Sequence, residues 1–333
     1  MSTPQEARFD VLGIGNAIVD VLANVTEEFL IKHDLVKGSM RLIDEVEAHE
    51  LYEALGPSVE MSGGSAANTI AGLASFGRRA AFIGKVRNDQ LGEVFAHDIR
   101  SLGVHFNTPP ATEGPSTARC LVMITPDGER TMNTWLGAAQ NLNPDDVDEA
   151  LVADSAIVYL EGYLWDPPHA KDAFRKAARI AREAGRKVAL TLSDSFCVDR
   201  HRESFLELIE NQVDILFANE AEIKALYQVP TFDEAMHAIK AHCPLAVLTR
   251  SAAGSVVVEG DDVHVIEAYP VRKVVDATGA GDLFAAGFLA GYSEGRPVAE
   301  CARLGALAAA EIIQQVGARS IRPFHEIARE NGF

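Results

Sequence analysis

The segment Asp276-Ala277-Thr278-Gly279-Ala280-Gly281-Asp282 carries the residues best suited to chemistry in this chain. An apolar stretch that predicts a helix, Leu283 to Tyr292, follows it directly. Small residues at such a turn leave backbone N–H groups and the positive end of the helix dipole open to an anion. We therefore predict an anion hole at Gly279, Ala280 and Gly281, of a size and polarity that suit a phosphoryl group.

Asp282 would lie in the first turn of that helix, beside the predicted anion hole. Its carboxylate could take the proton of a hydroxyl group that attacks a phosphoryl group there. The alternative is that Asp282 only stabilises the helix N-terminus, where acidic residues are common.

The segment from Ser62 to Thr69, SGGSAANT, also opens a predicted helix. Gly63 and Gly64 allow a ligand to approach the backbone, and Asn68 offers both a donor and an acceptor to a sugar hydroxyl. We predict that Gly63, Gly64, Ser65 and Asn68 bind the substrate; the alternative is a tight turn with a helix cap.

The segment from Gly13 to Asp20 resembles a dinucleotide fingerprint but lacks the third glycine, and β-prone residues follow where a helix should begin. Asn16 and Asp20 instead lie beyond the carboxyl end of the first predicted strand. A carboxylate there could bridge two adjacent hydroxyl groups, so both residues are predicted to bind the substrate. The alternative is an exposed turn Asn and a strand-end Asp.

Two further polar segments, NEAE at 219–222 and TRSAAG at 249–254, follow predicted strands. Glu222 could reach Mg²⁺ through water, and Arg250 could meet nucleotide phosphates; helix capping and surface charge are the alternatives. The sequence contains no GxxxxGK[ST] motif, which excludes a Walker-type phosphate loop.

Short apolar runs alternate with helical patterns along most of the chain, which predicts an α/β fold with a mainly parallel sheet covered by helices on both faces. The predicted strands of this sheet are 9–14, 80–83, 156–160, 187–192, 215–218 and 245–249. Two β-prone runs, 117–124 and 130–136, flank the turn Pro126-Asp127-Gly128 and predict a hairpin. We assign residues 1–16, 46–103 and 137–333 to a nucleotide-binding core, and 17–45 and 104–136 to a substrate lid.

The composition excludes several classes of protein. Hydrophobic residues make up 47% and charged residues 23% of the 333 residues, as in ordinary globular proteins. With 30 Lys and Arg against 48 Asp and Glu, the net charge of -18 opposes binding to nucleic acid. Four scattered cysteines predict no disulfide framework. The absence of an apolar leader and of a long apolar run predicts a cytoplasmic protein without membrane contact. We expect a monomer or a homodimer.

In this order, the motifs GGSAAN, NEAE, TRSAAG and DATGAGD resemble those of the ribokinase-like (PfkB) family of carbohydrate and nucleoside kinases, along nearly the whole chain. The resemblance implies a three-layer sandwich with a small β-rich lid, and Mg²⁺-ATP as the phosphoryl donor. GIGNAIVDV and GERTMNTWLGAA resemble the nucleoside branch, which implies transfer to the 5'-hydroxyl group of a nucleoside, adenosine in the first place. Phosphorylation of ribose or another neutral sugar, and an inactive sugar- or nucleoside-binding regulator, are the alternatives.

The resemblance also implies roles for individual residues. Asp282 would be the general base, and Asn16, Asp20, Gly64 and Asn68 would contact the ribose. Asn219, Thr249, Arg250 and Gly254 would bind ATP, Glu222 would organise Mg²⁺, and Asp276 and Thr278 would hold a monovalent cation such as K⁺. The chain departs from the family pattern at Ala277, where threonine is usual, and at Ala17, where the nucleoside branch usually has proline.

Three aromatic residues follow predicted strands: Tyr163, Trp165 and Phe196. They are candidates for stacking on a purine or for core packing.

Overall fold

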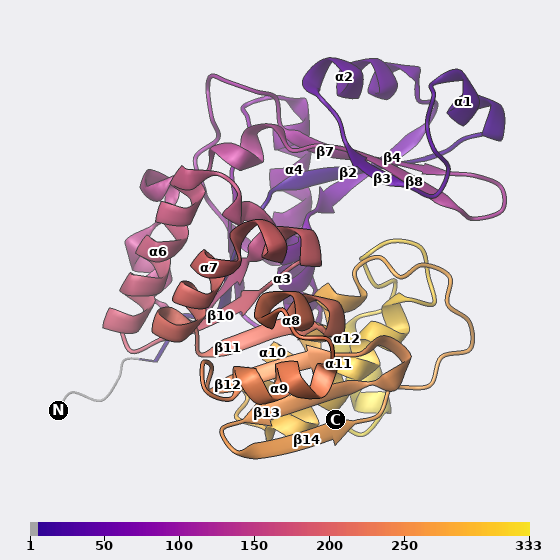
Figure 1. Ribbon diagram of the computed structural model, residues 1–333. Coiled ribbons are helices and arrows are strands. Elements are labelled where there is room, and N and C mark those ends of the chain that lie inside the picture. Colours follow the sequence, from indigo (N-terminus) through magenta and orange to yellow (C-terminus); the bar gives the residue numbers. More distant parts are fainter. Residues whose placement is uncertain (1–5) are drawn as a thin grey trace.

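The computed structural model describes residues 6–333, which form a large sheet, a small sheet and the helices that cover them (Figure 1). The strands of the large sheet are β1 (Phe9–Ile14), β5 (Ala80–Ile83), β6 (His105–Phe106), β9 (Ser155–Glu161), β10 (Lys187–Thr191), β11 (Ile215–Asn219), β12 (Leu245–Thr249), β13 (Ser255–Glu259) and β14 (Asp262–Ile266). Their order is β14-β13-β12-β11-β10-β9-β1-β5-β6. Neighbours pair in parallel except at β12–β13 and β13–β14, so the predicted mainly parallel sheet is confirmed.

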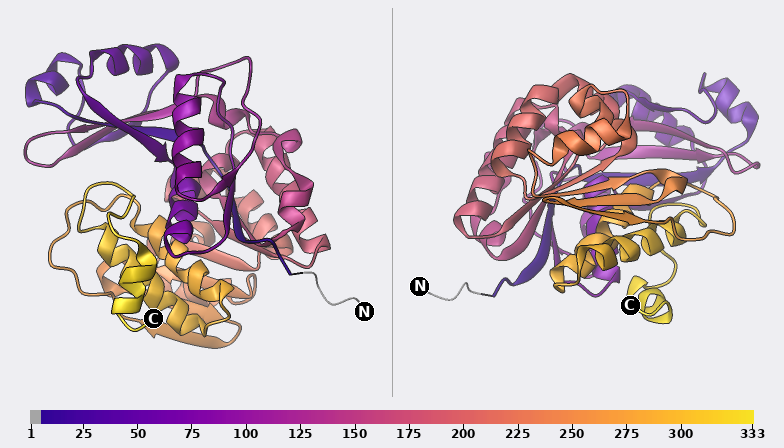
Figure 2. Two further views of the ribbon diagram at one scale, coloured as in Figure 1. Left: turned by 180° about the vertical axis from the view of Figure 1, so that it is seen from behind. Right: turned by 60° about the horizontal axis from the view of Figure 1, so that its bottom comes forward.

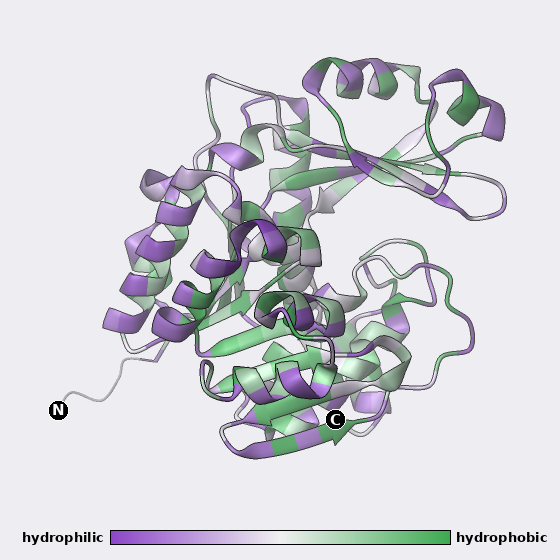
Figure 3. Ribbon diagram, in the orientation of Figure 1, coloured by the Kyte–Doolittle hydropathy of each residue, from purple (hydrophilic) through white to green (hydrophobic). Residues whose placement is uncertain are grey.

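Helices cover both faces of the large sheet, because its strands carry apolar side chains on both sides. One face packs against α3 (Ser65–Ser75), α4 (Gln90–Ser101), α10 (Ala280–Ser293), α11 (Val298–Ile312) and α12 (Phe324–Glu330). The other packs against α5 (Glu149–Ala153), α6 (Pro168–Glu183), α7 (Ser195–Gln212), α8 (Glu220–Tyr227) and α9 (Phe232–Ile239). Figure 2 shows the two helical layers on either side of the sheet, and Figure 3 shows the apolar strands between them. This is the expected three-layer sandwich.

The small sheet contains β2 (Ile18–Asn24), β3 (Met40–Leu42), β4 (Ser58–Gly63), β7 (Ala118–Ile124) and β8 (Arg130–Trp135), in the order β3-β8-β7-β2-β4. The predicted hairpin is its β7–β8 pair. Alternate side chains of β2 and β7, such as Val21 and Leu121, pack with Leu30 and Leu51 of α1 (Glu27–Lys32) and α2 (Glu45–Ala54). The opposite face of the sheet therefore points toward the large sheet.

Two boundaries of the predicted lid are wrong. Residues 46–63 were assigned to the core, but α2 packs against the small sheet and β4 pairs with β2 within it. Its sequence, SVEMSG, lacks the apolar run of a central strand, because β4 is an exposed edge strand. Residues 105–106 were assigned to the lid, but β6 pairs with β5 at the edge of the large sheet.

The parallel strands place their carboxyl ends along one edge of the large sheet, under the small sheet. Loops that follow β1, β9, β10, β11 and β12 therefore meet there, together with the N-termini of α3 and α10. Within residues 6–333, we find no helix of the length and apolarity that crossing a bilayer requires.

Candidate active site

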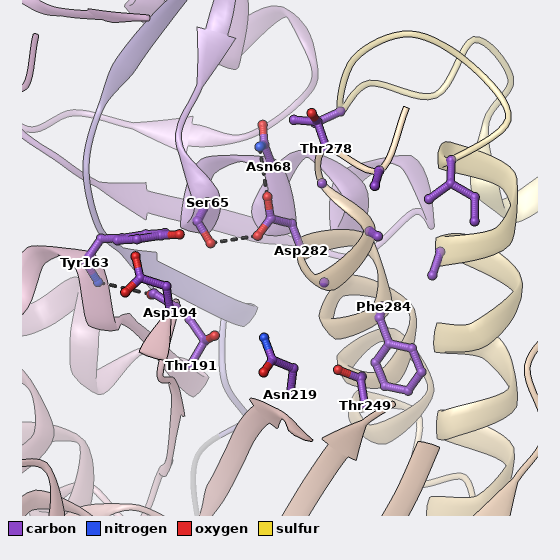
Figure 4. Close-up of a pocket in the computed structure, with 18 of the residues that line it drawn as sticks. Ser65, Asn68, Tyr163, Thr191, Asp194, Asn219, Thr249, Thr278, Asp282 and Phe284 are labelled. Atoms are coloured by element: carbon purple, nitrogen blue, oxygen red, sulfur yellow. Dashed lines mark hydrogen bonds between the residues drawn. The ribbon is translucent and has the colours of Figure 1, made fainter. Parts of the chain in front are cut away.

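A cavity of about 1290 Å³ lies between the small sheet and the carboxyl edge of the large sheet. It brings together most of the predicted site residues, several of which are drawn in Figure 4. The predicted residues that line it are Asn16, Asp20, Gly64, Ser65, Asn68, Asn219, Glu222, Thr249, Gly254, Thr278, Gly279, Ala280, Gly281 and Asp282. Gly63, Arg250 and Asp276 are not among the lining residues.

Asp282 lies at the centre of the cavity, in the first turn of α10 (Figure 4). Its Oδ1 accepts a hydrogen bond from Ser65 Oγ at 2.7 Å, and its Oδ2 accepts one from Asn68 Nδ2 at 2.9 Å. Both donors come from the start of α3, so the carboxylate is held between two helix N-termini.

Burial raises the pKa of Asp282 above its usual value, while the hydrogen bonds from Ser65 and Asn68 and the charge of Arg319 lower it. Burial is the largest of these effects. A carboxylate in such surroundings is a stronger proton acceptor than an exposed aspartate. The geometry therefore suits a general base.

The predicted anion hole is a turn into α10. Gly279 has φ +77°, a left-handed conformation that favours glycine, and the Cβ of any other residue would lie 2.6 Å from Ala318 Cβ. The first helical hydrogen bond runs from Leu283 N to Gly279 O at 2.8 Å, so the N–H groups of Gly281 and Asp282 precede it. The N–H group predicted to be open at Ala280 instead donates to Ala277 O at 3.2 Å. Gly281 is exposed to the cavity, and nothing lies within 4 Å of the position of a Cβ there. This turn has the open backbone that an anion needs.

Asn16 is held by a residue that sequence reasoning missed, Glu161 at the end of β9. Glu161 Oε1 accepts hydrogen bonds from Asn16 N at 3.1 Å and Asn16 Nδ2 at 2.6 Å, and Oε2 accepts one from Ala66 N at 2.7 Å. Asn16 Oδ1 is buried without a partner. Burial raises the pKa of Glu161 to about 7. Glu161 therefore fixes the side chain of Asn16. The amide oxygen of Asn16 can then accept a hydrogen bond from a hydroxyl group of a ligand.

Asp20 points from β2 toward the same end of the cavity. Burial raises its pKa to about 6, against the lowering effects of Arg319 and Arg130. A Cβ on Gly63 would lie 2.4 Å from Asp20 Oδ2. The role of Gly63 is thus corrected: it does not line the cavity, and its missing side chain makes room for the Asp20 carboxylate.

Arg130, at the start of β8, meets the residues predicted to hold a monovalent cation. Its NH1 lies 2.5 Å from Asp276 Oδ2 and donates to Thr278 Oγ1 at 3.3 Å. Asp276 also accepts hydrogen bonds from Thr278 N at 3.0 Å and Gly317 N at 2.8 Å. Asp276 and Thr278 do not fit a K⁺ site, because the guanidinium group of Arg130 already forms an ion pair with the Asp276 carboxylate. The ion pair also joins the small sheet to the loop before α10.

On the opposite side of Asp282, Asn219 and Glu222 form a capping box at the start of α8. Glu222 Oε2 accepts from Asn219 N at 2.9 Å, and its Oε1 accepts from Asn219 Nδ2. Burial raises the pKa of Glu222 to about 7. Among residues 6–333, no group of three or more His, Cys, Asp or Glu side chains is placed to hold a metal ion. Glu222 lines the cavity, and its contact with Mg²⁺ through water stays a prediction from the sequence.

Arg250 does not reach the cavity. Its Nε donates to Glu220 Oε2 at 3.0 Å, and its guanidinium group lies 4.2 Å from the ring centre of Phe232. The short 3-10 helix η4 (Ser251–Ala253) follows Arg250 directly, and Arg250 itself pairs with α8 and α9. In this structure Arg250 is therefore not placed to contact ATP phosphates, contrary to the prediction. Thr249 and Gly254 do line the cavity.

Both ends of the cavity contain apolar residues. Under the small sheet it is lined by Ile18, Leu22, Met40, Leu42, Met61, Val122 and Met132, and beyond β12 by Val247, Ala268, Pro270, Val271, Val274, Ala306, Ala309, Ala310 and Ile313. Tyr163 and Phe196 also line it, but Trp165 is fully buried against Phe174 and Phe205. Two separate apolar ends with polar groups between them suit two ligands that meet near Asp282.

Comparisons with known proteins identify the family of the chain. Residues 32–324 match the model of the pfkB family of carbohydrate kinases. The crystal structure of an adenosine kinase from Sinorhizobium meliloti is 53% identical, with a TM-score of 0.90, over 98% of this chain and 100% of that one. A probable sugar kinase from Rhizobium etli CFN 42 is 50% identical, with a TM-score of 0.90, over 98% and 99% of the two chains. The adenosine kinase of Saccharomyces cerevisiae is 27% identical over 327 residues, which cover 91% of this chain and 94% of the relative.

The open space at Gly281 allows a direct test of the anion hole. We expect Gly281→Val to fold normally, because its side chain enters the cavity, and to lose affinity for ATP, because it covers the N–H groups. Thermal unfolding and ATP titration calorimetry measure the two effects. Gly56→Val is the matched control, since a Cβ on Gly56 also meets nothing within 4 Å. Unchanged ATP affinity in a normally melting Gly281→Val variant would exclude the anion hole.

The Arg130–Asp276 ion pair predicts how the protein responds to K⁺. We expect the wild-type protein to have the same Tm in potassium chloride and in choline chloride at equal ionic strength, because Asp276 already has a cation partner. Arg130→Met leaves that carboxylate unpaired, so K⁺ should raise the Tm of this variant. A K⁺-specific rise of the wild-type Tm would contradict this interpretation.

Proposed function

The chain belongs to the pfkB family of carbohydrate kinases, and on this premise we propose that it transfers the γ-phosphoryl group of ATP to the 5'-hydroxyl group of adenosine. The family makes it a phosphotransferase that acts on a hydroxyl group. Its similarity to adenosine kinases from S. meliloti and S. cerevisiae supports adenosine as the acceptor. One observation carries the proposal: Asp282 lies inside the cavity at the Gly279–Gly281 turn, between the two apolar ends.

The acceptor would lie under the small sheet. Asp20, Asn16 and Asn68 surround that end with a carboxylate and two amides, which suits the hydroxyl groups of a ribose. Gly64 and Ser65 line the cavity beside them. The apolar inner face of the small sheet, including Leu22 and Met61, would bury the base. Free ribose would leave this apolar surface uncovered, so a nucleoside fits the cavity better than a sugar.

The phosphoryl transfer follows from this arrangement. The 5'-hydroxyl oxygen attacks the γ-phosphorus while its proton passes to the Asp282 carboxylate, and the bond from the γ-phosphorus to the bridging oxygen of ADP breaks. The N–H groups of Gly281 and Asp282 stabilise the negative charge that develops on the phosphoryl oxygens. The small sheet covers the site and excludes water as a competing acceptor.

ATP would occupy the opposite end, where Asn219, Thr249 and Gly254 line the cavity. When bound, Mg²⁺ offsets the charge of the ATP phosphates. Glu222 would hold it through water, since both Glu222 oxygens already accept hydrogen bonds from Asn219. Asp276 would not hold K⁺, because it pairs with Arg130. The cytoplasmic location and the monomeric or homodimeric state stay predictions from the sequence.

The similarity to the probable sugar kinase from Rhizobium etli favours a second candidate, a kinase for ribose or another neutral sugar. A regulator that only binds a sugar or nucleoside would not need a base in the anion-binding turn, so the position of Asp282 disfavours it.

Replacement of the proposed base separates catalysis from folding. In Asp282→Asn, the Ser65 hydroxyl group can rotate and accept a hydrogen bond from the new side-chain NH₂ group. The contacts between residue 282 and α3 can therefore persist. We expect kcat to fall by at least about 10²-fold, the lower end for general-base catalysis. Because burial disfavours the charged form of Asp282, the Tm of the variant at neutral pH should be equal to or higher than that of the wild-type protein. Near-normal kcat in a folded variant would rule out Asp282 as the base.

The choice of acceptor distinguishes the nucleoside kinase from the sugar kinase. We expect kcat/KM for adenosine to exceed that for free ribose, which buries no base, and that for fructose 6-phosphate, whose charge would face Asp20 and Asp282. ATP-dependent product formation with the three acceptors measures this. A preference for ribose would move the assignment to a sugar kinase, and a preference for fructose 6-phosphate would reject a neutral acceptor.

A further inference from the structure

Arg319, in the loop between α11 and α12, lies behind the acceptor end of the cavity and was not expected from the sequence. Its NH1 donates to Asn68 Oδ1, and its NH2 donates to Ser62 O at 2.5 Å and to Ser62 Oγ at 3.2 Å. Arg319 does not itself line the cavity. It therefore contacts Asn68, one of the two residues that donate hydrogen bonds to Asp282, from outside the cavity.

The orientation of the Asn68 amide depends on Arg319. Asn68 can place either its oxygen or its NH₂ group toward Asp282, and only the NH₂ group can donate to a carboxylate. A guanidinium group has donors and no acceptor, so Arg319 can only face the oxygen of that amide. The contact from Arg319 to Asn68 Oδ1 thus fixes the contact from Asn68 Nδ2 to Asp282 Oδ2.

Arg319 is itself anchored from behind. Ser62, which accepts from Arg319, donates to Asp98 Oδ2 through its N at 2.7 Å and through its Oγ at 2.6 Å. Arg319 Nε is buried and lacks a partner. A buried guanidinium group with an unpaired N–H is costly for stability, so packing alone does not explain why this position carries arginine.

We propose that Arg319 is a positioning residue for phosphoryl transfer: through Asn68 it orients the Asp282 carboxylate. This inference rests on the proposed role of Asp282 as the base. Among the residues that the structure describes, no other arginine or lysine side chain forms a hydrogen bond or ion pair with Asp282 or Asn68.

Several titratable groups face Asp282. They are Asp20 on β2, Tyr159 and Glu161 on β9, Tyr163 after β9, and Arg319. Only Arg319 is a cation, and its charge lowers the pKa of Asp282. Without it the pKa of Asp282 would rise, and the base would be protonated over a wider range of low pH.

The test compares two variants. Arg319→Met removes the positive charge and the N–H donors, whereas Arg319→Lys keeps the charge but lacks the planar guanidinium group with its several N–H donors. Arg322→Met is the control in the same loop, because Arg322 is exposed and pairs only with Glu330 among the described residues. The measurements are the pH dependence of kcat at saturating adenosine and Mg²⁺-ATP, and the Tm of each variant.

We expect Arg319→Met to lower kcat about 10-fold to 100-fold, as displaced catalytic groups do, and to move the acid limb of the pH profile to higher pH. Arg319→Lys should keep the limb near its wild-type position while restoring kcat only in part. Arg322→Met should change neither. An unmoved limb in Arg319→Met, whatever its Tm, would overturn the proposal.

Asp20 also faces Arg319, so its titration has to be separated from that of Asp282. The Arg319→Met comparison is therefore repeated in an Asp20→Asn background. Persistence of the shift there supports Asp282 as the group involved, and its disappearance overturns that assignment. A wild-type protein that does not phosphorylate adenosine would instead reject the proposed function, so the two failures are distinguishable.

Discussion

Two hydrogen bonds onto the Asp282 carboxylate, from Ser65 and Asn68, depend on how closely α3 and α10 approach each other. Gly72 permits this approach: a Cβ on Gly72 would lie 2.6 Å from Leu283 Cδ1 and 2.7 Å from Ala286 Cβ. Leu283 directly follows Asp282, so a wider helix spacing would carry the carboxylate away from its donors. The orientation of the Asp282 carboxylate therefore depends on this close contact between α3 and α10.

The sequence predicted the parts of the site that have local signatures. Glycine-rich turns before helices and polar residues after buried strands identified Ser65, Asn68 and Asp282, because parallel strands bring such loops to one edge. Arg319 carries no such signature, since its partner Asn68 lies 251 residues away. Glu161 was within reach of the same reasoning, because it ends a strand and precedes a glycine.

The parts of the fold that sequence reasoning missed have physical causes of the same kind. Strand β4 is a half-exposed edge strand without an apolar run, so its pairing with β2 is decided by tertiary contacts rather than by its own residues. Arg130 lies within the predicted hairpin, but its ion pair with Asp276 depends on how the small sheet lies over the core. Contacts between the two sheets are what a local pattern does not encode.

The small and large sheets contribute to opposite ends of one cavity. Inner-face residues of the small sheet, such as Leu22, Met61 and Val122, surround the end where an acceptor would lie, whereas the turn at Gly279–Gly281 and Asp282 belong to the core. A few substitutions on one face of the small sheet can thus exchange the accepted molecule while the reaction itself is inherited unchanged. Such a division makes the architecture readily evolvable, since new substrate ranges need no new catalytic apparatus.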